Sequence, residues 1–465
     1  MSACIKKYFL TSKDKFSAYR GFRHIVQSTS AKQRIKKFIA TIQSEPFGRP
    51  FSVPFTNYVL QPISIKQYLY SKLITQTFFQ SINLFFGSQG KQKICFPLPA
   101  QWRKDLEDNN IKINHFLSAF FLYLVACRNY ILGLIIGLKL CVRKSSKQYS
   151  DNQDSSFFNG LSDDNFPKNS ESRDILNWYT RSFNVSSEIK TITHNNFNQA
   201  LKIDINGFLV RYSSRLFAVE FNSVYERLKF IILYVLLSLK AFFYLIIGKI
   251  EPALMMQEMV LYIRASTIEP QKFHKEYLFH QSSVIFKPLW LDCAESAGSN
   301  AIVYFYSTNI QPLFHYDLDS PVSLYTWKNY FIWNDAHKNY LHTKLHKTPR
   351  YIVSEPIYFS DNSLESIPSL NSEKKILSIF DISPVRKSYY INLGIFHEYY
   401  SFSIIKSFYE DIINIAEKLD LQILIKPKRV LNNIHHKGYA KFLSNLGQNK
   451  NCLLYTSDAA DEEDS

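Results

Sequence analysis

The chain has 465 residues, enough for two domains of ordinary size, each with its own hydrophobic core. Apolar residues make up 46% of the sequence and charged residues 20%, a composition that excludes a wholly disordered protein. The six cysteines are scattered along the chain without a close pair. This scatter excludes a zinc ribbon and a disulfide-stapled secreted domain, and it indicates a reducing compartment.

The formal net charge of +16 is concentrated near the N-terminus. Residues 1–100 contain 15 Lys or Arg against two acidic residues, a net charge of +13. Such a region suits an anionic membrane surface, a phosphorylated ligand or nucleic acid, unless it is simply a solvated face. No zinc finger or ribonucleoprotein aromatic motif accompanies the charge. We therefore expect an anionic membrane surface as the partner, and no nucleic acid.

Two long apolar stretches follow, at residues 116–142 and 230–247. Both approach the 20 residues of a spanning helix, but each contains basic residues eleven positions apart. These are Arg128 and Lys139 in the first stretch and Lys229 and Lys240 at the second. That spacing puts each pair on one helical face, which is typical of a helix lying in the membrane interface. Spanning helices and buried core helices are the alternatives.

Between these stretches, residues 145–172 are rich in Ser, Asn and Asp, which predicts a polar linker or loop. From about residue 270, short β-rich runs alternate with helical segments. Strands are expected at 301–306, 330–333, 351–354, 376–382 and 422–425, with helices at 335–345 and 403–419. This alternation predicts right-handed crossovers and a parallel sheet in the C-terminal half of an α/β protein.

Polar clusters stand at three predicted strand ends, where parallel sheets bind ligands. The candidates for contact with a nucleotide or sugar are Ser307, Thr308, Asn309 and Asp381, and those for phosphate are Arg386, Lys426, Lys428 and Arg429. Clustered cations stabilise the charge that develops on a diphosphate leaving group. The chain has no P-loop, no G-x-G-x-x-G and no D-x-D within an apolar run. We therefore expect no metal ion and no bound cofactor. Solvated loops remain the plain alternative for each cluster taken singly.

A general base for an acceptor hydroxyl is expected to be His280 or Glu276. These residues are four apart and would face one way if the segment formed a helical turn. Asp335 and His337, which open the next predicted helix, are rival candidates. Asp335 has a plainer interpretation as an N-cap residue, and a histidine among aromatic residues is often part of a core.

Five segments of the sequence resemble bacterial surface-polysaccharide biosynthesis proteins of the PFTS-motif type. They are residues 174–179, 304–309, 330–334, 380–386 and 426–429. Pro54-Phe55-Thr56 supplies three letters of the motif, and Asn57 replaces its serine. The order of elements is also similar to the donor half of GT-B glycosyltransferases. Related sugar- and glycerol-phosphate polymerases commonly carry a His-Pro pair near the last segment, where this chain has Lys428.

The resemblance implies a GT-B-like, two-lobed glycosyltransferase at the cytoplasmic face of the bacterial inner membrane. Its donor would be a nucleotide sugar and its acceptor a glycan or a lipid-linked glycan. A non-catalytic scaffold of polysaccharide assembly and a polyol-phosphate transferase are the alternatives.

The predicted organisation has six parts. They are a basic region (1–100), an apolar helical segment (101–144), a polar linker (145–172), a mixed α/β region containing the helix at 230–247 (173–265), a GT-B-like donor-binding domain (266–451) and a tail (452–465). The tail resembles translated sequencing-adapter sequence, with a natural acidic tail as the alternative.

Overall fold

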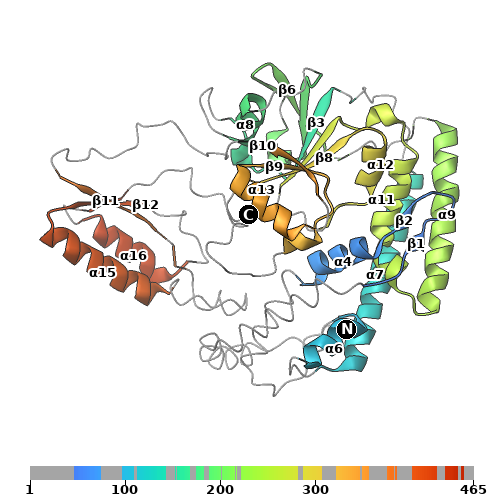
Figure 1. Cartoon of the computed structure of the whole chain (residues 1–465), viewed down its shortest axis with the longest axis horizontal. Helices are drawn as coiled ribbons and strands as arrows, with labels where there is room; N and C mark the ends of the chain where they lie inside the picture. Colours follow the sequence, from blue (N-terminus) through green and yellow to red (C-terminus); the bar gives the residue numbers. More distant parts are fainter. Residues whose placement is uncertain are drawn as a thin grey trace.

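A computed structural model of the chain shows a mixed α/β protein whose main sheet is rich in parallel strands (Figure 1). The structure describes residues 47–74, 97–108, 113–142, 152, 154–167, 174–182, 188–200, 202–214, 216, 221, 223–280, 286–305, 321–345, 348–354, 374–381, 383–384, 401–426, 435–448 and 452–454.

The main sheet has eight strands in the order β10-β9-β8-β7-β3-β4-β6-β5. Every neighbouring pair in it is parallel except β5 with β6. The strands are β3 (Ser155–Asn159), β4 (Thr191–His194), β5 (Ile203–Ile205), β6 (Phe208–Tyr212), β7 (Glu276–His280), β8 (Asn300–Tyr304), β9 (Asn329–Ile332) and β10 (Arg350–Val353). Helices are packed on both faces, as parallel sheets require.

One face of this sheet packs against α8 (Ile175–Ser182), in a cluster that contains Phe158, Trp178 and Tyr304. The other face belongs to the larger hydrophobic cluster, which includes α11 (Met256–Ser266) and α12 (Trp290–Ser296). The crossover helix α13 (Asp335–Lys344) joins β9 to β10, in agreement with the predicted helix.

Among the described residues, five further α-helices come before β7. Three of them precede β3, and two lie with α11 in the connection from β6 to β7. They are α4 (Pro62–Leu69), α6 (Ala100–Asp108), α7 (His115–Cys141), α9 (Val224–Ile246) and α10 (Glu251–Leu254). A two-stranded hairpin of β1 (Phe51–Ser52) and β2 (Val59–Leu60) precedes them. Its turn contains the Pro54-Phe55-Thr56 segment, with Phe55 in the left-handed region at φ 55° and 85% exposed.

A three-stranded parallel sheet in the order β11-β12-β13 forms a separate unit. It consists of β11 (Ile376–Phe380), β12 (Gln422–Lys426) and β13 (Cys452–Leu454), with α15 (Phe402–Lys418) and α16 (Lys437–Leu446). Its buried side chains form their own hydrophobic cluster. We call this part the small unit, and the eight-stranded sheet with its helices the large body.

Two expectations about the sheet need correction. The segment 145–172, expected as a linker, contributes β3, which lies between β4 and β7 at the centre of the large sheet. The parallel sheet is therefore not confined to the C-terminal half. The strands expected within 266–451 also do not share one sheet, because β7–β10 belong to the large body and β11–β12 to the small unit.

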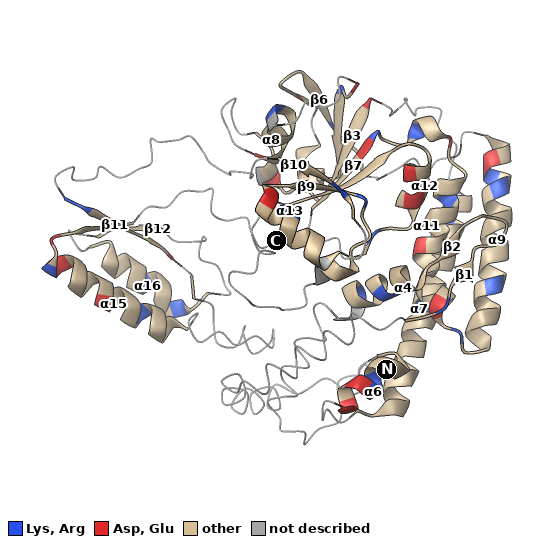
Figure 2. Cartoon of the chain, in the orientation of Figure 1, with Lys and Arg blue, Asp and Glu red and all other residues tan. Residues whose placement is uncertain are grey.

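Both apolar stretches form helices, α7 and α9, which are long and apolar enough to cross a membrane. Length and composition alone give a hint of membrane association. Figure 2 shows α9 as mainly uncharged along its length, with a few charged residues between. Most of the basic N-terminal region lies outside the described residues, since 1–46 and 75–96 are not described.

Candidate functional site

The carboxyl ends of β11 and β12 meet at one edge of the small unit. Phe380 pairs with Lys426 in register, and the backbone N–H of Asp381 donates to the Lys426 carbonyl at 2.9 Å. Asp381 and Lys426 are therefore neighbours, as expected from their positions after two parallel strands. Of the other predicted phosphate contacts, Arg386, Lys428 and Arg429 lie outside the described residues.

The N-terminus of α16 is attached to the same edge. The N–H of His436, the N-cap residue, donates to the Pro384 carbonyl at 2.8 Å. The His436 ring stacks on Phe402 of α15, and its Nδ1 accepts from the Gly438 N–H at 3.1 Å. A helix N-terminus carries partial positive charge, so this edge combines a cation with a favourable dipole.

The Asp381 carboxylate is buried and receives a hydrogen bond from the Tyr439 hydroxyl of α16. Burial raises the pKa of Tyr439 above its usual value, and the negative charge of Asp381 raises it further. The same two causes raise the pKa of Tyr409. The tyrosines stay protonated and can donate, so Asp381 fixes α16 against β11. This geometry favours a positioning role for Asp381 over direct contact with a ligand.

Glu276 and His280, the two predicted bases, are the first and last residues of β7. The segment does not form the helical turn that would bring them together, because β7 pairs with β3 and β8 in the sheet. Residues four apart in a strand still share a face, but they stand about 13 Å apart along it. Glu276 and His280 therefore cannot act together on one proton.

Glu276 is held in a partly buried hydrogen-bond network at the amino end of β7. Its Oε2 accepts from Tyr179 at 2.6 Å and from Ser156 at 3.2 Å, and the two hydroxyls lie 2.6 Å apart. Burial raises the pKa of Tyr179 well above its usual value, with the Glu276 charge as the second cause. The network joins β3, β7 and α8, which is a structural role.

His280 lies at the carboxyl end of β7, the edge at which parallel sheets bind ligands. Its ring is 5.5 Å from that of Tyr304 on β8, and burial lowers the pKa of His280 to about 3. The imidazole is therefore neutral at pH 7 and able to accept a proton, although weakly basic. Ser307, Thr308 and Asn309 follow β8 at this edge in the sequence, and they lie outside the described residues.

The rival pair at the start of α13 also has a structural explanation. Asn334, and not Asp335, is the N-cap residue, and its side chain accepts from the His337 N–H at 2.9 Å. The His337 ring packs edge-on against Phe305 at 4.5 Å, and burial lowers its pKa to about 4.

His194 is a further residue at this edge, and the sequence analysis did not single it out. It ends β4 and is fully buried, and its ring meets Phe166 edge-on at 4.6 Å. Neither ring nitrogen has a hydrogen-bond partner among the described residues, and burial lowers its pKa to about 4. Its neighbour Asn195 bridges Gly160 and Asn159 at the end of β3. The only signal was the alternating run Thr191–His194.

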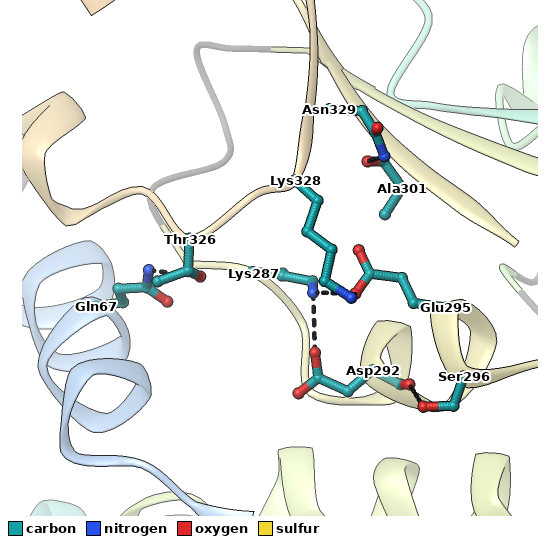
Figure 3. A network of polar contacts seen from close by, with 9 residues as sticks. All are labelled: Gln67, Lys287, Asp292, Glu295, Ser296, Ala301, Thr326, Lys328 and Asn329. Carbon is teal, nitrogen blue, oxygen red and sulfur yellow. Dashed lines mark hydrogen bonds and ion pairs between the residues drawn. The ribbon is translucent and has the colours of Figure 1, made fainter. Parts of the chain in front are cut away.

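A second polar network, shown in Figure 3, lies beside the start of β9. Lys287 donates to Asp292 at 2.8 Å and to Glu295 at 2.9 Å, and Lys328 reaches Glu295 at 2.7 Å. Burial acts to lower the pKa of Lys287, but the two carboxylates outweigh it and raise the pKa. Because Lys328 directly precedes β9, this network lies at the amino edge of the sheet and stabilises the fold there.

The described residues contain no group of three or more His, Cys, Asp or Glu side chains that could hold a metal ion. The carboxyl edge of the small unit therefore offers a cation and a helix N-terminus. The carboxyl edge of the large body offers neutral imidazoles.

Comparison with known families gives one match. Residues 237–463 match the family model of the Polysaccharide biosynthesis PFTS motif protein. The matched range contains β7–β13, and with them His280 and the carboxyl edge of the small unit. It excludes β3–β6 with His194, and it excludes Pro54-Phe55-Thr56. It also includes most of the tail, whose first residues form β13 (Cys452–Leu454), and the origin of the tail as adapter sequence stays a prediction.

Searches among curated proteins and among solved structures give no match. The family match supports a polysaccharide biosynthesis protein with a role in surface polysaccharide synthesis.

Proposed function

We propose that the protein is a glycosyltransferase that moves a sugar from a nucleotide donor to a glycan or lipid-linked acceptor. It would work at the cytoplasmic face of the bacterial inner membrane. The family match supports the pathway, and the apolar helices α7 and α9 support the location.

The observation that carries the proposal is the meeting of Asp381, Lys426 and the α16 N-terminus at one edge of the small unit. Donor phosphates would bind there, between the Lys426 ammonium and the helix N-terminus. Arg386, Lys428 and Arg429 are the further cations that the sequence assigns to this site. Asp381 would hold α16 in place through Tyr439.

A GT-B-like division would make the small unit the donor half and the large body the acceptor half. Of the two predicted bases, His280 suits the acceptor better, because it lies at the carboxyl edge and is neutral at pH 7. Glu276 suits it less, because Tyr179 and Ser156 already donate to its carboxylate.

The test is nucleotide binding by the full chain in mild detergent, followed as a thermal shift with UDP, GDP, dTDP and CMP. We expect one nucleotide to raise the melting temperature, and the double variant Arg386→Ala, Lys426→Ala to lose the shift. Lys441→Ala, an exposed lysine on α16, is the control and keeps it. A cooperatively melting protein that none of the four nucleotides stabilises contradicts the proposal.

A non-catalytic scaffold of polysaccharide assembly is the second candidate. The observation that favours it is that Asp381 and Glu276 both accept hydrogen bonds from buried tyrosines, as structural carboxylates do. A polyol-phosphate transferase would use the same cations and release a nucleoside monophosphate, so the released nucleotide separates it from a transferase that uses a diphosphate-activated sugar.

A further inference from the structure

Helices α7 and α9 pack side by side as an antiparallel pair (Figure 1). The Tyr123 hydroxyl donates to the Leu245 carbonyl at 3.3 Å, and the Tyr130 hydroxyl donates to the Ser238 carbonyl at 3.1 Å. In the other direction, Tyr234 donates to the Leu134 carbonyl at 2.9 Å. Positions rise along α7 as they fall along α9, so the two helices run in opposite directions.

The pair has one buried side and one exposed apolar side. The buried side packs on α10 and α11. Asn129 donates to the Leu254 carbonyl there, and Met256 packs so closely on Gly133 that a Cβ at this position would collide with it. The other side exposes large apolar residues from both helices. They include Phe120, Ile131, Leu138, Ile232, Leu239 and Phe243, all at least 48% exposed. An apolar surface this continuous marks a site of contact with a membrane or another protein.

Basic residues border this apolar side along both helices. Arg128 and Lys139 are exposed on α7, and at about 100° per residue they lie on one line between its apolar and buried sides. Lys229 and Lys240 lie on the corresponding line of α9. The only acidic residue of the two helices is Glu226, which is buried against Arg264 at 2.7 Å. The bordering charge is therefore complementary to anionic lipid headgroups.

The antiparallel contacts also fix the depth of these charges. They place Arg128 level with Lys240, and Lys139 level with Lys229, two levels about 16 Å apart. Arg128 is the middle residue of α7, so a spanning pair centred in a hydrocarbon core about 30 Å thick would bury Arg128 and Lys240 at its centre. If the hydrocarbon core is shifted toward the C-terminal end of α7, it buries Lys139 and Lys229 instead. If the core is shifted toward the N-terminal end of α7, only residues 241–246 of α9 remain to cross it.

We propose that the α7–α9 pair lies flat in the surface of an anionic lipid bilayer. Its apolar side enters the acyl-chain boundary, and Arg128, Lys139 and Lys229 bind headgroup phosphates along its two borders. Lys240, whose Nζ donates to the Ser52 carbonyl at 2.7 Å, also fixes the β1–β2 hairpin beside the membrane. This placement goes beyond the proposed transfer reaction and does not depend on it.

The first test is co-flotation of the full chain with vesicles of phosphatidylcholine, with and without 30% phosphatidylglycerol. We expect tighter binding to the anionic vesicles. The triple variant Arg128→Gln, Lys139→Gln, Lys229→Gln should lose about 100-fold of that affinity, about fivefold for each charge. The matched control is Lys338→Gln, Lys418→Gln, Lys441→Gln, which removes the same charge from exposed positions elsewhere and should retain the affinity.

The second test measures depth with spin labels attached through a ketone-bearing residue, placed singly at Phe120, Ile131 or Leu138 of α7. The flat placement predicts the same shallow depth for all three labels in anionic vesicles. A depth that is greatest at Ile131 and smaller toward the ends shows a spanning helix and overturns the proposal. Equal losses of vesicle affinity in the two triple variants also overturn the proposal. So does a protein that, without detergent, forms a dimer and binds neither kind of vesicle.

Discussion

The two parallel sheets of this protein differ in what their carboxyl edges offer. In the large body, the edge has His280 and His194, imidazoles that burial keeps neutral, set among aromatic rings. In the small unit, the edge has Asp381, Lys426 and a helix N-terminus. The first environment suits apolar contact with a neutral ligand group, and the second suits an anion. The same topology thus presents two different chemical environments, because strand-end residues decide the chemistry.

The largest expected loss of unfolding free energy comes from a substitution in the large body. Glu226→Ala removes the carboxylate that pairs with Arg264, a buried guanidinium that also donates to Thr267 and packs over Phe221. An uncompensated buried charge costs about 3–5 kcal/mol of unfolding free energy. Chemical denaturation should show this loss. Glu410→Ala, which breaks the exposed pair with Lys406 in the small unit, should change the same free energy by less than about 1 kcal/mol. Equal losses would contradict the account.

The next effect concerns pH and the large body. His194 has a pKa of about 4 when folded and about 6.5 when unfolded, so the unfolded chain binds more protons between these values. The contribution of His194 to stability is therefore complete above about pH 6.5 and falls by about 3 kcal/mol as the pH drops to 4. His194→Phe should reduce this slope in denaturation curves across that range. An unchanged slope shows that the folded protein solvates or pairs this imidazole.

A smaller loss of stability is expected from a substitution in the small unit. Tyr439→Phe removes from the buried Asp381 the hydroxyl that donates to it from α16, at a cost of about 1–3 kcal/mol. Hydrogen exchange should become faster for amides of β11 and β12 and stay unchanged for those of β7. Faster exchange in β7 as well would mean that the two parts unfold as one.

The smallest effect is expected for the matching tyrosine of the large body. Tyr179→Phe removes one donor from Glu276, but Ser156 continues to donate. We expect a loss of about 1 kcal/mol, measured by denaturation, because one neutral hydroxyl contributes about that much. A loss greater than that of Tyr439→Phe would reverse the order predicted for the two carboxylates.

Local elements were predicted well from the sequence because their patterns are local. The strands at β8, β9, β10, β11 and β12 and the helices α13 and α15 are confirmed to within about two residues, since alternating apolar runs end at polar turns. The central strand β3 was missed because it begins Ser155-Ser156 within a Ser- and Asp-rich segment. Its burial comes from neighbours far away in the sequence, β4 and β7.

The candidate site was predicted only in part for the same reason. The contact between Asp381 and Lys426 follows from two parallel strands, so sequence order was sufficient. The separation of Glu276 from His280 depends on β7 being a strand, which a periodicity of four residues cannot distinguish from one helical turn. The position of His194 could not be predicted without the strand order, because β4 is placed beside β3 by contacts between segments that are distant in the sequence.

The most direct test of the central claim is sugar transfer. Membranes containing the full chain would be given UDP-, GDP-, dTDP- and CMP-activated sugars, each radiolabelled, and the label followed into lipid and polymer. The account predicts that label from one donor is incorporated, that Lys426→Ala abolishes the incorporation, and that Lys441→Ala retains it. Incorporation that is the same with and without the protein, or that survives Lys426→Ala, would contradict a donor site at the carboxyl edge of β11 and β12.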